Sequence, residues 1–289
     1  MDLLSALLQG ILLGGLYALF ATGLSFMFGV MRIVNLAHGA LAVFAAYGVL
    51  ILVRAGITNP LLALLIVVPL MAALGYLLQR TILQRTLTES PLPSLLVTFG
   101  LSIIIENLLL LTQSANQQRL SLGALDTASI SLFGGIRIGV FPLCVLIFTL
   151  LVLTALSLLM RKTQFGRLVR AVSDDPDTVA LSGASPKHIY GIAAAIAFGL
   201  VAVAGMANGV QAGFNPTSGG LLLIFAFEAV IIGGLGSLWG TLLGAMLLGV
   251  VQTVTASFDS TLFQFAGHLV FFVFLVFLPN GLIRRKVRL

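Results

Sequence analysis

Long apolar runs separated by short polar breaks dominate the chain. A helix needs about 20 apolar residues to cross the hydrocarbon core of a bilayer, and nine runs approach that length. Helices satisfy their backbone hydrogen bonds within lipid, and the alternating pattern of membrane β-strands is absent. The sequence therefore predicts an all-α integral membrane protein with one transmembrane domain over residues 1–289. The predicted spans lie near residues 3–30, 37–53, 61–79, 93–112, 140–160, 189–213, 220–237, 240–257 and 262–282.

The number of spans is open between eight and ten, because only the short break "LWG" separates the seventh and eighth runs. The distribution of basic residues favours nine. With the C-terminus inside, the inner segments hold Arg32, Arg80, Arg85, five basic residues between 161 and 187, and Arg284, Arg285, Lys286 and Arg288 in the tail. The outer segments hold only Arg54, Arg119 and Arg137. Because cytoplasmic loops are enriched in Lys and Arg, this bias predicts an outer N-terminus and a cytoplasmic C-terminus.

Composition agrees with a membrane location and argues against a nucleic-acid partner and a metal site. The chain is 59% hydrophobic and only 8% charged, outside the range of soluble domains. The net charge of +6 follows from the loop bias, so it does not predict a nucleic-acid partner. The first apolar run is too long for a cleaved signal peptide and lacks a basic region before it, so it is expected to remain as a span. Cys144 is the single cysteine, and three scattered histidines predict no metal cluster and no cofactor.

Two loops are long enough to have structure of their own. The outer loop, residues 113–139, alternates polar and apolar residues in places, which leaves a small hairpin, a short interfacial helix or a plain connector open. The inner loop, residues 161–188, predicts a helix of about two turns from Pro176 to about Ser182, with acidic residues before it and Gly183 after it. A second Ser-Pro pair, Ser185-Pro186, is expected to begin the next span. So short a helix needs something to dock against.

Two carboxylates fall inside predicted spans, where an ionisable group is a candidate for function. Glu106 lies toward the outer end of its span and can reach the interface, whereas Glu228 lies near the middle of "GGLLLIFAFEAVIIGGLG". We therefore expect Glu228 to face a polar cavity or a helix break. Glycine-rich stretches in the first span and in Gly233–Gly249 are typical of close helix packing.

Two stretches resemble each other: "NLAHGALAVFAA", residues 35–46, and "NPTSGGLLLIFAF", residues 215–227. Each begins with Asn, reaches Gly four residues later and enters an apolar run. Paired helix breaks in corresponding halves indicate a transporter's substrate path, although a chance likeness and an ordinary inner loop remain open. For His38, a titrating or ligand-binding role and simple pairing with local backbone are both open. The candidate pathway residues are Asn35, His38, Gly39, Asn215, Pro216, Thr217, Gly219 and Glu228.

Three stretches together resemble a known family. They are "LLGGLYALFATGLSFMFGVMRIVNLAHGAL", "FGRLVRAVSDDPDTVALSGAS" and "AVIIGGLGSLWGTLLGAMLLG". They are similar to the permease subunits of ABC importers for branched-chain amino acids, a family that also includes urea and short-chain amide permeases. The resemblance implies the ABC importer permease fold and a multi-pass location in a bacterial-type inner membrane. It also implies a second permease subunit, two cytoplasmic ATPases and a periplasmic or extracellular substrate-binding protein as partners.

The same resemblance implies that the inner loop seats in an ATPase groove. The chain has no GxxxxGK[ST] phosphate loop, so it is expected to act without its own ATPase site. It departs from relatives at Ala45-Ala46-Tyr47 and at Glu228, which leaves the substrate open. The residues that match the family's ATPase-coupling segment are Gly166, Arg167, Arg170, Ala171, Asp174, Asp175, Pro176 and Gly183.

Three alternatives stand beside the branched-chain amino-acid importer. A urea or short-chain amide permease has the same architecture. A partner-free secondary transporter would couple to protons through Glu228 or Glu106. An intramembrane enzyme is disfavoured, because the spans contain no recognisable catalytic arrangement.

Overall fold

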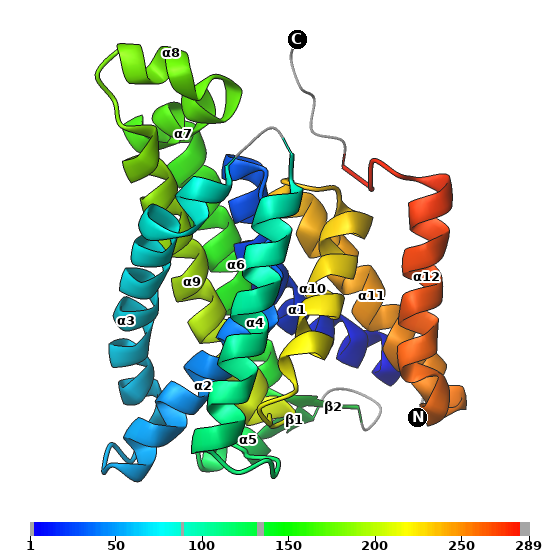
Figure 1. The fold of residues 1–289 in the computed structure, drawn as a ribbon. Helices are drawn as coiled ribbons and strands as arrows, with labels where there is room; N and C mark the ends of the chain where they lie inside the picture. Colours follow the sequence, from blue (N-terminus) through cyan, green and yellow to red (C-terminus); the bar gives the residue numbers. More distant parts are fainter. Residues whose placement is uncertain (1–2, 88–89, 132–135, 284–289) are drawn as a thin grey trace. The chain divides into compact units, whose positions relative to one another are not determined.

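Helices make up most of the computed structural model, which describes residues 3–87, 90–131 and 136–283 (Figure 1). Within that part, seven segments are long and apolar enough to cross a membrane. Two shorter apolar helices, α2 (His38–Arg54) and α10 (Gly219–Gly233), match the remaining predicted runs. The helical membrane architecture is therefore confirmed. The seven longer segments are α1 (Leu3–Met31), α3 (Pro60–Thr81), α4 (Leu92–Thr112), α6 (Val140–Lys162), α9 (Pro186–Gln211), α11 (Leu238–Phe258) and Ser260–Phe277, which joins η3 (Ser260–Leu262) to α12 (Phe263–Phe277).

Polar residues set the ends of several helices. Asn59 precedes α3 and accepts a hydrogen bond from the backbone N–H of Leu61 at 2.9 Å, with Pro60 at the first helical position. Ser237 accepts one from Gly240 at 3.1 Å and so begins α11. These are the partners that helix N-termini require and that lipid cannot supply. The seventh and eighth runs are thus separate helices, but the break lies at residues 234–237, and the "LWG" residues that were expected to form it are the first turn of α11.

Two helices end earlier than the sequence predicts. α10 stops at Gly233 because Gly234 has φ of 102°, a left-handed conformation that ends a helix. α12 stops at Phe277, shortly before Pro279 and Gly281. The chain then returns to the end of α10, where the N–H groups of Leu282 and Ile283 donate to the carbonyls of Ile232 and Gly233. The four basic residues of the tail, Arg284, Arg285, Lys286 and Arg288, lie outside the described residues.

The chain divides into two compact units. The first comprises residues 1–25, 121–153 and 224–289, with α11 packed against α12. Its glycines permit close helix contact: a Cβ on Gly14 would lie 2.5 Å from Met246 Cα, and one on Gly249 would meet the Gly10 carbonyl. The packing interpretation of both glycine-rich stretches is thus confirmed. The unit also holds α5 (Ala124–Thr127) and the antiparallel strands β1 (Ser129–Ser131) and β2 (Arg137–Gly139), so the outer loop contains both a short helix and a hairpin.

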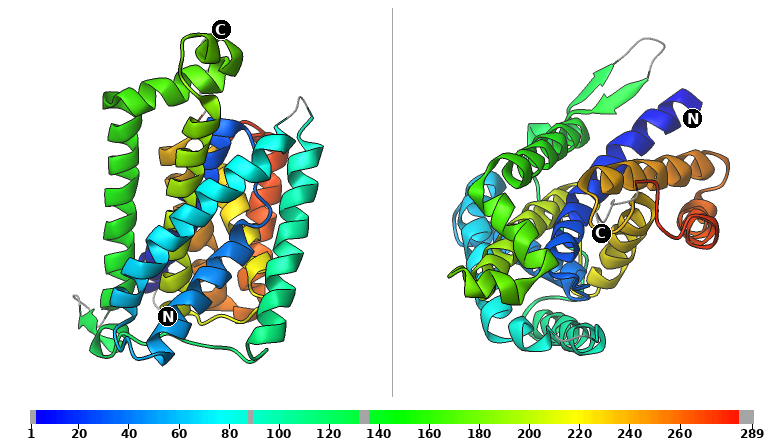
Figure 2. Two further views of the ribbon diagram at one scale, coloured as in Figure 1. Left: turned by 60° about the vertical axis from the view of Figure 1, so that its left-hand side comes forward. Right: turned by 90° about the horizontal axis from the view of Figure 1, so that it is seen from above.

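The second unit comprises residues 26–120 and 154–223, with α9 packed on α2 and α3. It also contains η1 (Leu83–Thr86), α7 (Gln164–Asp174) and α8 (Pro176–Leu181). Figures 1 and 2 show α7 turning away from the axis of α6, and α8 following it before the chain enters α9. The inner loop therefore contains two helices where the sequence analysis predicted one. The apolar residues Phe165, Leu168, Val169 and Val172 have the helical spacing that predicts α7.

Candidate functional site

The first break lies between α1 and α2. Residues 32–37 are not helical, and the Asn35 side chain accepts a hydrogen bond from the backbone N–H of Ala37 at 3.0 Å. Thr98 of α4 accepts another from the Leu36 N–H at 3.1 Å. Asn35 and His38 are fully buried. Two hydrogen bonds to side chains thus hold the chain where helical bonding is lost.

The second break, between α9 and α10, is built in the same way. The side-chain oxygen of Asn215 accepts hydrogen bonds from the Thr217 N–H at 3.1 Å and from the hydroxyls of Thr217 and Ser218 at 2.9 and 2.8 Å. Pro216 is buried and Thr217 is exposed. Both asparagines therefore accept from the N–H two residues ahead, which is the turn chemistry expected at such breaks.

The two breaks meet. A Cβ on Gly39 would overlap the carbonyl oxygen of Gly219, and a Cβ on Gly219 would lie 2.8 Å from the Cα of Ala40. The first turns of α2 and α10 therefore touch backbone to backbone within the second unit. Close approach of this kind requires glycine at both positions. The structure thus brings together two of the sequence-identified segments, which are about 180 residues apart in the chain.

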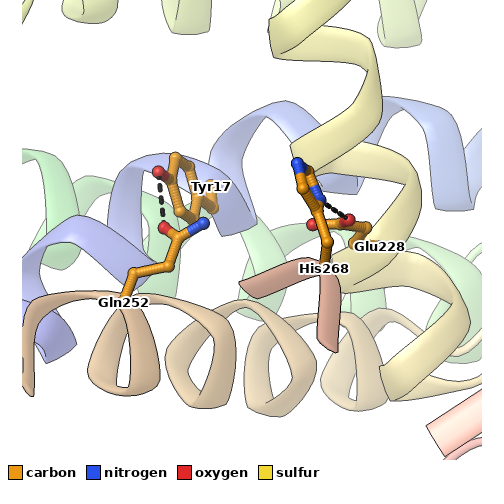
Figure 3. A network of polar contacts seen from close by, with 4 residues as sticks. All are labelled: Tyr17, Glu228, Gln252 and His268. Carbon is orange, nitrogen blue, oxygen red and sulfur yellow. Dashed lines mark hydrogen bonds and ion pairs between the residues drawn. The ribbon is translucent and has the colours of Figure 1, made fainter. Parts of the chain in front are cut away.

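Glu228 lies in the first unit, where it is 2% exposed. Its side chain pairs with the Nδ1 atom of His268 on α12 (Figure 3). The ring of Phe225 stacks against His268 with centroids 6.3 Å apart and against Tyr17 of α1 with centroids 5.0 Å apart. A buried carboxylate in a span is thereby given a polar partner.

A second polar pair lies beside the first. The Tyr17 hydroxyl donates to the side-chain oxygen of Gln252 at 2.9 Å. The other oxygen of Glu228 and the side-chain nitrogen of Gln252 are buried without a hydrogen-bond partner (Figure 3). Each pair therefore leaves one buried polar atom, an acceptor on Glu228 and a donor on Gln252, for which a water molecule is the usual partner.

Sequence reasoning identified Glu228 but missed His268, Gln252 and Tyr17. Their partners are 40 to 235 residues away in the chain, so no local pattern reports the contacts. Glu106, the other intramembrane carboxylate, is half-buried on α4. No cluster of three or more His, Cys, Asp or Glu side chains suited to a metal ion occurs among residues 3–87, 90–131 and 136–283.

The inner segment begins with a tight corner between α6 and α7. Thr163 accepts a hydrogen bond from the Gly166 N–H at 3.1 Å and so caps α7. A Cβ on Gly166 would overlap the carbonyl of Met160, and the Arg170 guanidinium donates to that same carbonyl. Gly166 and Arg170 therefore shape the corner itself. Arg167, Ala171 and Asp174 are exposed on α7.

Helix α8 confirms the predicted two-turn helix. The Asp175 carboxylate accepts hydrogen bonds from the Thr178 hydroxyl and from the N–H groups of Thr178 and Asp177. These bonds, the Thr178 hydroxyl foremost, hold the pKa of Asp175 below its usual value. Pro176 follows at the first helical position, and Gly183 has φ of 86° after the last turn. Ser185 stands before Pro186 at the start of α9 but makes no side-chain capping bond.

One large apolar side chain on α8 is almost fully exposed. Leu181 is 90% exposed, whereas Val179 is buried at 8%. Leu168 of α7 is also exposed, at 39%. Val179 and Leu181 thus differ in environment: the chain itself covers the first, and the second is open to contact.

Comparison with known proteins gives a consistent result along the whole chain. Residues 6–278 match the family model described as branched-chain amino acid transport system, permease component. The chain is 28% identical over 294 residues to the high-affinity branched-chain amino acid transport system permease protein BraD of Pseudomonas aeruginosa, covering 98% of this chain and 96% of that protein. It is 26% identical over 303 residues to LivH of Escherichia coli, at the same coverage. A probable branched-chain amino acid transport permease protein LivH of Methanocaldococcus jannaschii is 25% identical over 276 residues, or 92% of this chain and 85% of that protein. No solved structure matches significantly.

Proposed function

The chain belongs to the branched-chain amino acid transport permease family, and we propose that it is the membrane-spanning subunit of an ABC importer that moves branched-chain amino acids inward. The observation that supports this most is a family match over residues 6–278 combined with an exposed two-helix inner segment. The importer's other parts are a second permease subunit, two cytoplasmic ATPases and an external substrate-binding protein. The chain itself contributes the path and the ATPase contact.

The path proposed here contains the two helix breaks and Glu228. In the proposed topology of nine crossings with an outer N-terminus, α7 and α8 are cytoplasmic, and the basic residues between 161 and 187 support this orientation. Closure of the ATPase pair around ATP displaces α8, and α7 transmits the movement to α6 and α9, between which it lies in the chain. Alternating access follows when the helices that begin at the breaks, α2 and α10, change their contact.

Reconstitution tests the function. The purified chain is placed in liposomes with its second permease, ATPases and binding protein, and uptake of radiolabelled leucine is measured with and without ATP. We expect uptake only in the complete system with ATP, and none by the isolated chain under an imposed proton gradient. Uptake by the isolated chain would instead establish a secondary transporter. Competition by unlabelled urea or acetamide, but not by isoleucine, would establish the amide-permease alternative.

Leu181 tests the ATPase contact. We expect Leu181→Asp to weaken binding of the ATPases about tenfold or more, because a buried leucine contributes about 1.5–3 kcal/mol that a carboxylate cannot. The measurement is recovery of ATPases on the tagged permease. Leu181→Met is the matched control and should retain binding. Leu181 is a cleaner probe than Arg170, whose guanidinium already bonds to the Met160 carbonyl. Equal recovery with the Asp variant would exclude Leu181 from the contact.

A further inference from the structure

A basic and aromatic cluster joins α3 to α9 at the end of the second unit from which α7 and α8 extend. The Arg80 guanidinium donates to the Tyr76 hydroxyl at 2.7 Å, and this hydroxyl lies 2.9 Å from Nδ1 of His188. Arg80 and Tyr76 are one helical turn apart on α3, and His188 is in the first turn of α9. We refer to Tyr76, Arg80, Lys187 and His188 as the α3–α9 cluster.

The backbone is adapted to hold this cluster. A Cβ on Gly191 would lie 2.6 Å from Cε2 of Tyr76, so the glycine provides the recess that the tyrosine ring occupies. The ring contacts His188 edge-on, with centroids 5.8 Å apart, and the Arg80 guanidinium lies 5.9 Å from the ring centroid. Tyr76 is therefore fixed in position, and its hydroxyl contacts both a cation and an imidazole.

No carboxylate among the described residues pairs with the basic residues of the cluster. Among the described residues the only ion pair is between Glu228 and His268. Arg80, Lys187 and His188 are all exposed. An arginine has five N–H donors, and the bond to Tyr76 uses one of them, so most of the guanidinium remains available to an anion.

Apolar side chains flank the cluster on the outer surface of α3. Leu77 is 57% exposed and Ile82 is 44% exposed, on either side of Arg80 in the chain. Cations, a tyrosine hydroxyl and adjoining apolar surface together match one kind of partner, a lipid with an anionic headgroup.

We propose that the α3–α9 cluster binds the phosphate of an anionic phospholipid, with the acyl chains along Leu77 and Ile82. Arg80 and Lys187 contact the phosphate, and Tyr76 positions Arg80 for it. Because Arg80 is on α3 and Lys187 is on α9, the lipid bridges the two helices close to the point where α8 leads into α9. The lipid site does not depend on the transported substrate, so the test of lipid binding is independent of the test of the proposed function.

Native mass spectrometry of the full-length chain tests the proposal. The protein in detergent is titrated with phosphatidylglycerol, with phosphatidylcholine of the same acyl chains, and with inorganic phosphate alone. We expect retained phosphatidylglycerol, little phosphatidylcholine and no effect of phosphate. The variant Arg80→Gln combined with Lys187→Gln should weaken phosphatidylglycerol binding about tenfold or more, since each basic residue near a membrane surface contributes about a fivefold factor.

Arg85→Gln is the matched control. Arg85 is exposed on η1, a few residues beyond Arg80. Its replacement by Gln removes one positive charge outside the cluster. It should leave binding unchanged, and Tyr76→Phe should give an intermediate loss because it removes the hydroxyl while keeping the ring. Equal loss with Arg85→Gln would indicate general charge attraction and overturn the site. Unchanged lipid binding in the double variant, with lost ATPase recovery, would show a protein contact instead.

Discussion

Replacing Gly39 with alanine is expected to lower the free energy of unfolding by about 1–3 kcal/mol and to reduce transport at least about tenfold. The added methyl group would overlap the carbonyl oxygen of Gly219, which is backbone and cannot rotate away. The first turns of α2 and α10 must then separate, and both helix breaks move with them. Thermal unfolding in detergent and leucine uptake by the complete reconstituted system measure the two effects.

Gly48→Ala is the matched control, because it lies on the same helix. A Cβ there would be 3.5 Å from the nearest methyl group of Val67, an ordinary van der Waals distance. We expect this variant to unfold and transport like the unchanged protein. Gly219→Ala should repeat the Gly39 result from the other side, since its Cβ would lie 2.8 Å from Ala40. If Gly39→Ala behaved like Gly48→Ala, the contact between the two breaks would not matter for transport.

The features that the sequence predicted well depend on residues that are close together in the chain. Apolar runs of membrane length predicted the helices, and Asp175, Pro176 and Gly183 predicted both ends of α8. Each of these signals acts within a few residues: a side chain caps, a proline begins a helix and a left-handed glycine ends it. The same locality explains why α10 and α12 were predicted too long. Hydropathy continues past Gly233 and Phe277, whereas the backbone turns there.

The candidate site is less visible in the sequence because its contacts join distant residues. The likeness of residues 35–46 and 215–227 indicated two breaks, yet nothing in it required Gly39 to touch Gly219. His268 lies 40 residues from Glu228, in a run that is otherwise apolar. A single histidine in such a run belongs to no sequence pattern from which its contact with Glu228 could be predicted. Helix α7, by contrast, has a local signal in the helical spacing of its apolar residues. It was nevertheless not predicted, because the segment before Pro176 was interpreted as a loop.

Replacing His268 with leucine is expected to lower the free energy of unfolding by about 1–3 kcal/mol, although leucine suits the half-exposed position on α12. The loss comes from Glu228, whose buried carboxyl group would keep no hydrogen-bond partner. Glu228→Gln should cost less, because an amide N–H can donate to a neutral imidazole in the same place. Thermal unfolding in detergent distinguishes these variants.

The double variant Glu228→Leu, His268→Leu is the decisive comparison. Removing both partners leaves no unmet polar group, so it should be more stable than His268→Leu alone and close to the unchanged protein. A double variant no better than the single one would attribute the loss to packing against Phe225 and not to the buried carboxyl. Leucine uptake then separates stability from transport. If Glu228 belongs to the substrate path, the double variant folds well and still transports poorly. Normal uptake would show that the Glu228–His268 pair only stabilises the contact between α10 and α12.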